Sequence, residues 1–183
     1  MTTGHVYIAT TLDGFVARED HRIDWLNAYH QTGEDLGYDA FMESVDGLVM
    51  GRNSFQTVLS FGFWPYKKPV IVLSQTLASK DIPETLPSNV EVSTLSPTEI
   101  MADLKKRGWS RVYVDGGRLV QSFTRLGLIE DYIVTTVPIL IGRGCRLFGE
   151  LNSDVHLECV STAGYPSGLV QTHYRVSPRS PIQ

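Results

Sequence analysis

The sequence predicts one α/β domain over residues 1–183, with a central mixed, mostly parallel sheet, helices on both faces and an antiparallel C-terminal part. Through the first two-thirds of the chain, short apolar and β-branched segments alternate with segments of helical periodicity, which favours parallel pairing. The last third contains strand-like segments separated by short turns, which favours antiparallel pairing. With 42% hydrophobic and 20% charged residues, the composition is that of a globular protein.

Each element follows from a local pattern. Apolar, β-branched runs predict strands at 5–11, 47–50, 70–74 and 111–115, with a short edge strand at 89–93. Apolar spacing, capping residues and closing glycines predict helices over 32–45, 54–59, 96–107 and 119–126, the third with a capping box at Ser96 and Glu99. Further strands are predicted at 132–141, 155–162 and 168–176, a long loop at 12–27, and a flexible tail at 177–183.

Charge and composition argue against several classes of protein. The formal net charge is −4, whereas nucleic-acid binding usually requires a basic face. No apolar run reaches the roughly 18–20 residues of a membrane span, and the first residues lack the pattern of a secretory signal, so we expect a cytoplasmic protein without a membrane partner. Cys145 and Cys159 have no histidine at metal-ligand spacing, so we expect small core residues and no metal site.

Two similar junctions are the strongest chemical signal in the chain. Residues 49–54 and 114–119 each run from a strand through glycine and arginine into a helix. A helix N-terminus attracts phosphate through its free N–H groups and dipole, glycine lets phosphate approach the backbone, and arginine adds a bidentate charge. A single junction of this kind is explained equally well as an ordinary turn between a strand and a helix. Two at the carboxyl edge of neighbouring parallel strands fit a dinucleotide, although neither contains the G-x-G-x-x-G fingerprint.

Several segments, in order, resemble the dihydrofolate reductase superfamily. Within it, the chain is similar to the reductase domain of the bifunctional deaminase-reductases of riboflavin biosynthesis and to its stand-alone relatives. The similar segments are 10–17, 50–55, 72–75, 114–117, 128–132, 138–142 and 147–148, which together span nearly the whole chain. The resemblance implies a dihydrofolate-reductase-like three-layer fold and NADPH-dependent reduction of a small heterocyclic substrate. The His-x-Glu and Pro-Cys-x-x-Cys signature of a deaminase domain is not found.

The resemblance also implies which residues bind the cofactor. The backbone of Ala9 is implied to face the nicotinamide carboxamide, and Trp25 matches a tryptophan beside the cofactor. Those implied at the pyrophosphate and adenosine side are Gly51, Arg52, Asn53 and Ser54, with Ser74 and Gln75 near the 2′-phosphate. Those implied to cradle the pyrophosphate are Gly116, Gly117, Arg118 and Leu119, and we expect a positive φ at Gly117. Asp115 matches an acidic position that meets the substrate in the riboflavin-type enzymes.

The sequence departs from the riboflavin-type reductases in two places that concern the substrate. The riboflavin-type reductases usually follow the first junction with an Asp-Asp-Pro loop that helps to hold the ribose phosphate of their substrate, and residues 56–61 contain no such loop. Phe15 stands where a lysine often follows Asp-Gly. The leading hypothesis is a reductase similar to 5-amino-6-(5-phosphoribosylamino)uracil reductase. The alternatives are a dihydrofolate (pterin) reductase and a non-catalytic NADP-binding sensor.

Hydride transfer to a C=N bond or a hemiaminal requires a proton donor, and three aspartates are candidates: Asp35, Asp115 and Asp13. Asp35 stands sixteen residues before Gly51, the separation at which dihydrofolate reductases place the carboxylate that holds the pterin ring. The alternative for Asp35 is a charge at the positive end of a helix. Asp13 is either a turn residue or adjacent to the site. The surrounding loop, residues 12–25, is either a lid over the nicotinamide or an ordinary surface loop.

The sequence also suggests an oligomer. Residues 132–141 form a long apolar segment, and a strand of that kind at a sheet edge needs covering. Related reductases associate through this end of the sheet. We therefore expect a homodimer.

Overall fold

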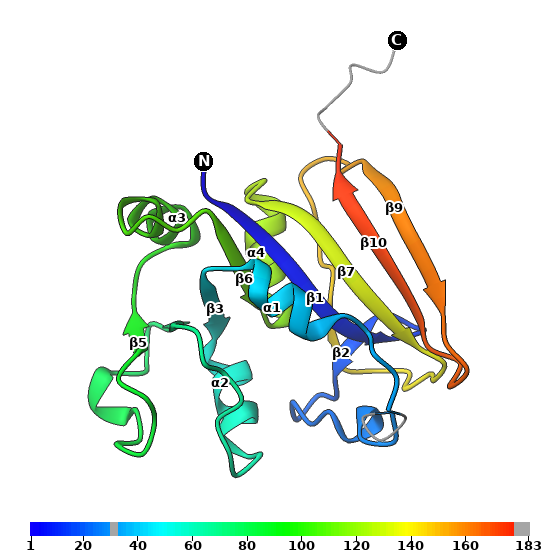
Figure 1. Ribbon diagram of the computed structural model, residues 1–183, viewed down its shortest axis with the longest axis horizontal. Coiled ribbons are helices and arrows are strands. Elements are labelled where there is room, and N and C mark those ends of the chain that lie inside the picture. Colours follow the sequence, from blue (N-terminus) through cyan, green and yellow to red (C-terminus); the bar gives the residue numbers. More distant parts are fainter. Residues whose placement is uncertain (30–32, 178–183) are drawn as a thin grey trace.

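The computed structural model describes residues 1–29 and 33–177, which form one eight-stranded sheet in the order β5-β4-β3-β6-β1-β7-β10-β9 (Figure 1). Its strands are β1 (Thr3–Thr11), β3 (Gly47–Gly51), β4 (Val70–Leu73), β5 (Val90–Ser93), β6 (Arg111–Asp115), β7 (Ile129–Val137), β9 (Leu157–Gly164) and β10 (Val170–Val176). A separate two-stranded sheet pairs β2 (Phe15–Ala17) with β8 (Cys145–Arg146). The helices are α1 (Tyr38–Ser44), α2 (Arg52–Leu59), α3 (Pro97–Lys106) and α4 (Gly117–Arg125), with 3-10 turns η1 (Asp24–Leu26) and η2 (Ser79–Asp81).

The sheet is mixed, as predicted. From β5 to β7 in the sheet order all neighbouring strands are parallel, and β10 and β9 are then added antiparallel. β7 is parallel to β1, with Val6 opposite Tyr132, because α4 connects β6 to β7 across the face of the sheet. The antiparallel part is therefore the β9–β10 hairpin alone, not the whole of the last third.

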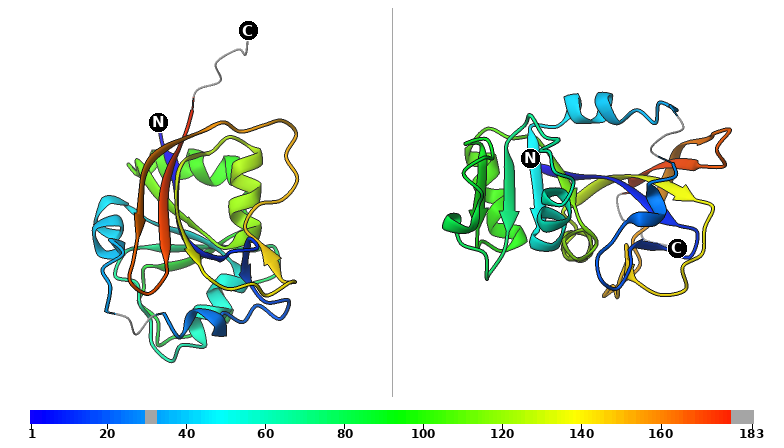
Figure 2. Two further views of the ribbon diagram at one scale, coloured as in Figure 1. Left: turned by 90° about the vertical axis from the view of Figure 1, so that its right-hand side faces the viewer. Right: turned by 90° about the horizontal axis from the view of Figure 1, so that it is seen from below.

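Apolar clusters on the two faces of the sheet give the fold its three layers. On one face, Leu104 of α3 and Phe123 of α4 pack in the same cluster as Val49 of β3. On the other face, α1 and α2 pack against Leu48 and Met50, the neighbours of Val49, because successive side chains of a strand point to opposite faces. Figure 2 shows α1 and α4 on opposite sides of β1. Each large apolar side chain buried in this way stabilises the fold by roughly 1.5–3 kcal/mol.

Local sequence patterns predicted some helix boundaries correctly and missed others. The predicted capping box is present, because Ser96 N–H donates to Glu99 Oε2 at 2.9 Å and Ser96 Oγ accepts from Glu99 N–H at 3.4 Å. The helix expected from residue 32 begins instead at Tyr38, after Gly37 with φ 79°; residue 32 itself lies outside the described part of the chain. A left-handed residue cannot lie inside a right-handed helix, so Asp35 lies in a loop and not on α1.

The segment 12–27, predicted as a loop, contains β2 and η1. β2 pairs with β8 of a distant segment, and a pairing of this kind leaves no short-range pattern. The strand predicted at 132–141 spans Ile129–Val137 and ends before Pro138, which has no N–H group for the ladder. The tail predicted at 177–183 lies, except for its first residue, outside the described residues.

β7 is not an edge strand of the sheet, whose two edges are β5 and β9. β7 lies between β1 and β10, and all eight residues of β9 are exposed (Figure 1). The expectation that both cysteines are core residues was wrong, since Cys159 is exposed on β9 and Cys145 on β8 is only half-buried. Among the described residues, no helix has the length and apolar character required to cross a membrane.

Candidate functional site

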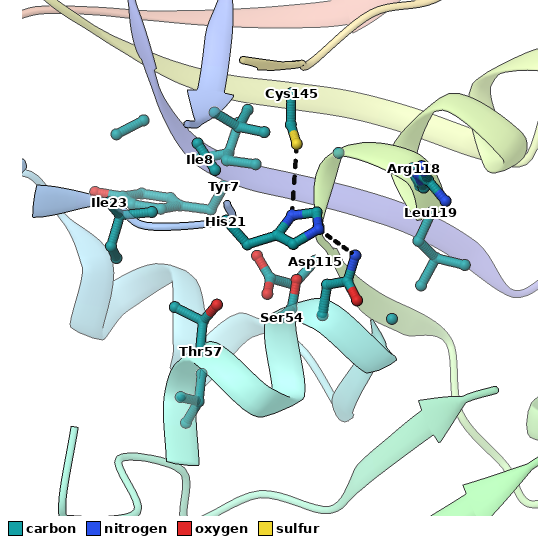
Figure 3. A pocket seen from close by; sticks show the side chains of 18 of the residues that line it. Tyr7, Ile8, His21, Ile23, Ser54, Thr57, Asp115, Arg118, Leu119 and Cys145 are labelled. Carbon is teal, nitrogen blue, oxygen red and sulfur yellow. Dashed lines mark hydrogen bonds between the residues drawn. The ribbon is translucent and has the colours of Figure 1, made fainter. Parts of the chain in front are cut away.

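The carboxyl ends of β1, β3, β4 and β6 border a cavity of about 1210 Å³. Figure 3 shows part of its lining. In a parallel sheet the helices that follow the strands begin at this edge, so the N-termini of α2 and α4 both face the cavity. The residues predicted for the site that line it are Ala9, Asp35, Gly51, Arg52, Asn53, Ser54, Ser74, Gln75, Asp115, Gly116, Gly117, Arg118 and Leu119.

At the first junction the helix begins directly after Gly51. Arg52 is the first residue of α2, two residues earlier than predicted, and no side chain caps the helix N-terminus. Gly51 has φ −80°, which any residue adopts, and a Cβ atom built on it would have no heavy atom within 4 Å. Neither backbone conformation nor packing therefore requires glycine at this position. Its effect is to leave open space in front of the first N–H groups of α2.

The second junction differs in detail. α4 begins at Gly117 and again has no side-chain cap, and its preceding residue Gly116 has φ 97°. The expected positive φ at Gly117 was thus wrong by one residue. Gly117 is required for another reason, because its Cβ would lie 2.9 Å from both the Arg146 carbonyl oxygen and Val16 Cγ2. The absence of a side chain allows the β2–β8 sheet to approach the first turn of α4.

The end of β4 forms a polar corner beside α2. Arg52 Nη1 donates to Thr76 Oγ1 at 2.9 Å, and Ser74 Oγ accepts from Leu77 N–H at 3.0 Å. Gln75 Nε2 donates to the Thr94 carbonyl oxygen at 2.7 Å, so its amide is already engaged. Arg52, Ser74 and Thr76 thus form the corner. No signal in the sequence pointed to Thr76.

His21 is the second residue that the sequence did not single out. Asn53 Nδ2 donates to His21 Nε2 at 3.0 Å, and His21 Nδ1 lies 3.5 Å from the Cys145 thiol (Figure 3). His21 adopts φ 66°, which is rare for a residue other than glycine. It lies on the loop between β2 and η1, so it joins that loop to α2 on one side and to β8 on the other.

Asp115 lies deepest among the predicted acids. Its side chain lies next to that of Ser54 (Figure 3), and Tyr113 Oη donates to Asp115 Oδ1 at 3.3 Å. Burial raises the pKa of Asp115, and the hydrogen bonds from Ser54, Tyr113 and the Gly116 N–H only partly oppose that rise. Asp115 therefore holds a proton more readily than an ordinary aspartate. The i, i+2 spacing on one strand would have placed Tyr113 on the same face as Asp115.

Tyrosines line the part of the cavity that includes Asp35. Burial, with a smaller contribution from the charge of Asp35, raises the pKa of Tyr7 to about 12. Tyr7 Oη donates to the Leu36 carbonyl oxygen at 2.8 Å. The Asp35 side chain is exposed at the surface of this segment, and its Oδ1 accepts from Gly37 N–H at 2.7 Å. Glu34 anchors the segment, because its Oε1 accepts from Ser167 N–H at 2.9 Å.

Asp13 and Trp25 are not among the described residues that line the cavity. Asp13 Oδ1 accepts from Thr11 Oγ1 at 2.6 Å, and Asp13 Oδ2 accepts from Gly142 N–H at 2.7 Å. The carboxylate therefore connects the loop after β7 to the loop after β1. The Thr11 hydrogen bond is the main reason that the pKa of Asp13 is lowered. Trp25 is buried in an apolar cluster beneath the loop.

Comparison with known proteins assigns the chain to a family. The model of the RibD C-terminal domain matches residues 3–171. A crystal structure of a Shewanella sp. PV-4 protein provisionally assigned to riboflavin biosynthesis superposes with a TM-score of 0.89 at 39% identity, covering 97% of this chain and 100% of that chain.

Two more distant structures share the fold. The Thermotoga maritima diaminohydroxyphosphoribosylaminopyrimidine deaminase/5-amino-6-(5-phosphoribosylamino)uracil reductase matches with a TM-score of 0.70 and 18% identity, over 96% of this chain and 57% of that chain. The dihydrofolate reductase of Enterococcus faecalis, in complex with NADP(H), matches with a TM-score of 0.62 and 18% identity, over 96% of this chain and 97% of that chain. The predicted dihydrofolate-reductase-like fold is thereby confirmed. By the extent of its family match, the chain belongs to the RibD C-terminal domain family.

Proposed function

We propose that this protein is an NADPH-dependent reductase of a small heterocyclic substrate. The observation that carries the proposal is the pair of uncapped helix N-termini, at Gly51–Arg52 and Gly116–Gly117, that open onto one cavity. The cavity, at about 1210 Å³, exceeds the roughly 300–1,000 Å³ of a typical small-ligand pocket, as expected for a cofactor and a substrate together. Membership of the RibD C-terminal domain family supports a reductase of this type.

The residues present fit a dinucleotide phosphate. The open space at Gly51 would take the pyrophosphate against the N–H groups of α2, with Gly116 and Arg118 on the α4 side. The corner formed by Arg52, Ser74 and Thr76 would hold the 2′-phosphate, because a guanidinium and hydroxyls satisfy its oxygens. Ala9, on β1 beside the cavity, would face the nicotinamide.

NADPH, when bound, supplies the hydride. The chain's part is to hold the substrate and to deliver one proton to the nitrogen or oxygen on which charge develops. Asp115 is the carboxyl best suited to this role, because burial raises its pKa and Ser54 and Tyr113 fix its orientation. Asp35, another carboxyl on the cavity, would orient the substrate from the opposite segment.

We also propose a homodimer that forms through β9. Its eight residues are exposed, including Leu157 and Val160 at 41% and 43%, and its outer backbone groups have no neighbouring strand in the sheet. A second copy of the chain would cover this edge.

Cofactor binding and turnover test the proposed function separately. We expect NADPH to bind at least about tenfold more tightly than NADH, a difference of about 1.4 kcal/mol, in titration calorimetry. Arg52→Ala should weaken NADPH binding much more than NADH binding, and Arg175→Ala, an exposed arginine on β10, should change neither. Equal affinity of the wild-type protein for both cofactors would contradict the proposal. Tight NADPH binding without substrate-dependent NADPH oxidation, measured over a panel of pyrimidines and pterins, would indicate the sensor instead.

A further inference from the structure

The charges that line the cavity are segregated. The arginines of the described lining, Arg52, Arg118 and Arg146, all belong to the glycine junctions or adjoin them, since the Arg146 carbonyl oxygen lies against Gly117. Figure 3 shows Arg118 and Leu119 on one side of Asp115 and Tyr7 on the other. The positive charge of the cavity is therefore concentrated where the cofactor phosphates are proposed to bind.

The other part of the cavity combines carboxylates with tyrosines. After burial, the largest influence on the raised pKa of Tyr38, about 12, is the charge of Asp115, followed by Tyr7 and Asp39. Asp115 also raises the pKa of Tyr66, again after burial. These tyrosines stay neutral at physiological pH. The described lining contains no lysine, and its arginines are the three named above.

A phosphate placed there would meet charges of its own sign. A phosphate monoester carries nearly two negative charges at pH 7, and Asp35 and Asp39 would repel it. A flat ring suits the same surroundings, because tyrosine rings stack on it and carboxylates accept hydrogen bonds from ring N–H and amino groups. The missing Asp-Asp-Pro segment at 56–61 agrees with this, since that loop would otherwise help to hold a ribose phosphate.

We infer that the substrate of this site is an unphosphorylated, flat nitrogen heterocycle, neutral or cationic, that is held between the tyrosines with its N–H groups toward Asp35. This inference rests on the proposed function. It names the substrate class, and it separates this chain from reductases that act on phosphoribosyl compounds.

The test compares ligands that differ only by a phosphate. With the protein saturated with NADP⁺, the binding of 6-hydroxymethylpterin and of its phosphate monoester is followed by fluorescence, alongside the phosphoribosylaminopyrimidine substrate of the riboflavin-type reductases. We expect the unphosphorylated pterin to bind at least about tenfold more tightly than its phosphate ester, with a ratio that shrinks as salt is added. Equal or tighter binding of the ester, binding of the phosphoribosyl compound alone, or no pterin binding at 1 mM would each overturn the inference.

A charge-neutral variant tests the cause of the discrimination. Asp35→Asn combined with Asp39→Asn should lower the pterin-to-ester ratio severalfold and leave NADPH affinity unchanged. Glu84→Gln removes an exposed carboxylate from a distant loop and should leave the ratio as it is. An unchanged ratio in the double variant would refute repulsion as the mechanism. NADPH affinity is measured on the same samples without pterin, so a failure of the proposed function appears as lost cofactor binding and not as a changed ratio.

Discussion

Neither the backbone conformation nor the packing of the folded protein requires glycine at position 51. Its φ of −80° suits any residue, and a side chain would project into open space. Gly51→Ala should therefore leave the free energy of unfolding unchanged, or raise it by about 0.4–1 kcal/mol through the unfolded chain. NADPH binding should weaken at least about tenfold, because the methyl group occupies the proposed path of the pyrophosphate.

A matched control exists on β9. Gly164 also has open space around its Cβ position and no positive φ, so Gly164→Ala should affect stability in the same way as Gly51→Ala and leave NADPH affinity unchanged. Urea unfolding and calorimetric titration of the two variants measure both effects. Wild-type NADPH affinity in Gly51→Ala would place the pyrophosphate elsewhere. Gly117→Val would be a poorer test, because its side chain collides with Arg146 and Val16 whether or not a phosphate binds.

Asp115 and Asp35 are distinguished by the pH dependence of turnover. If Asp115 delivers the proton, activity is present below its raised pKa and is lost as pH rises through it. Asp115→Asn should lower the rate by about 10² or more and abolish this loss at high pH, with NADPH affinity nearly unchanged. Asp35→Asn should mainly raise KM and keep the pH profile of the wild type. The reverse assignment would follow if Asp35→Asn were the variant that lost the pH-dependent limb.

A buried ion cluster joins β1, β6, β7 and β10 away from the cavity. Around Asp131 Oδ2 lie His5 Nδ1 at 3.0 Å, His173 Nε2 at 3.7 Å and Arg111 Nη2 at 4.0 Å. Burial alone would raise the pKa of Asp131, but its interactions with His5, His173 and Arg111 outweigh burial and lower that pKa. The native state therefore holds the ionised carboxylate more strongly than the unfolded chain does.

The resulting stability has a defined pH window. It is complete well above the ordinary pKa of 3.8 and is lost as pH falls below that value through the lowered native pKa. Asp131→Asn should reduce the free energy of unfolding at pH 7 by about 1–3 kcal/mol and flatten its decline between pH 5 and 3, as measured by urea unfolding. Glu130→Gln, an exposed neighbour on the same strand, should follow the wild type. Parallel decline of the Asp131→Asn variant and the wild type would exclude Asp131 as the titrating group.

The sequence predicted those elements whose signals are local. The Ser96–Glu99 capping box set the start of α3, and apolar, β-branched runs located the strands of the eight-stranded sheet, because these features depend on neighbours along the chain. The start of α1 was missed because Gly37 with its φ of 79° interrupts a segment of helical spacing. The pairing of β2 with β8 depends on residues about 130 positions apart, which no local pattern records.

The residues of the candidate site also divide into those that local sequence patterns predicted and those that they did not. The glycine junctions were predicted because strand, turn and helix follow one another there, whereas Asp115 was implied by the resemblance to the riboflavin-type reductases. His21, which bridges Asn53 and Cys145, and Thr76, which accepts from Arg52, come from loops whose course only the folded chain fixes. The contact of Asp13 with the Gly142 N–H could not be predicted for a related reason, since the two residues are 129 positions apart in the sequence.

Helices cover one end of the sheet and leave the other end uncovered. α1, α2, α3 and α4 cover the sheet around β3 and β6, whereas the β9–β10 hairpin projects beyond them at the other end (Figure 2). Every residue of β9 is exposed. The proposed dimer would place this strand against its copy.

One consequence of the exposed β9 strand is thermodynamic. If folding and association are linked, the melting temperature depends on how much protein is present, because mass action favours the paired state. For a dimer of this chain length we expect a rise of about 2 °C for each tenfold increase in concentration, measured by scanning calorimetry. Val160→Lys, which places a charge in the middle of β9, should abolish that dependence and leave the dilute wild-type value, whereas a concentration-independent wild type would show that the strand stays unpaired.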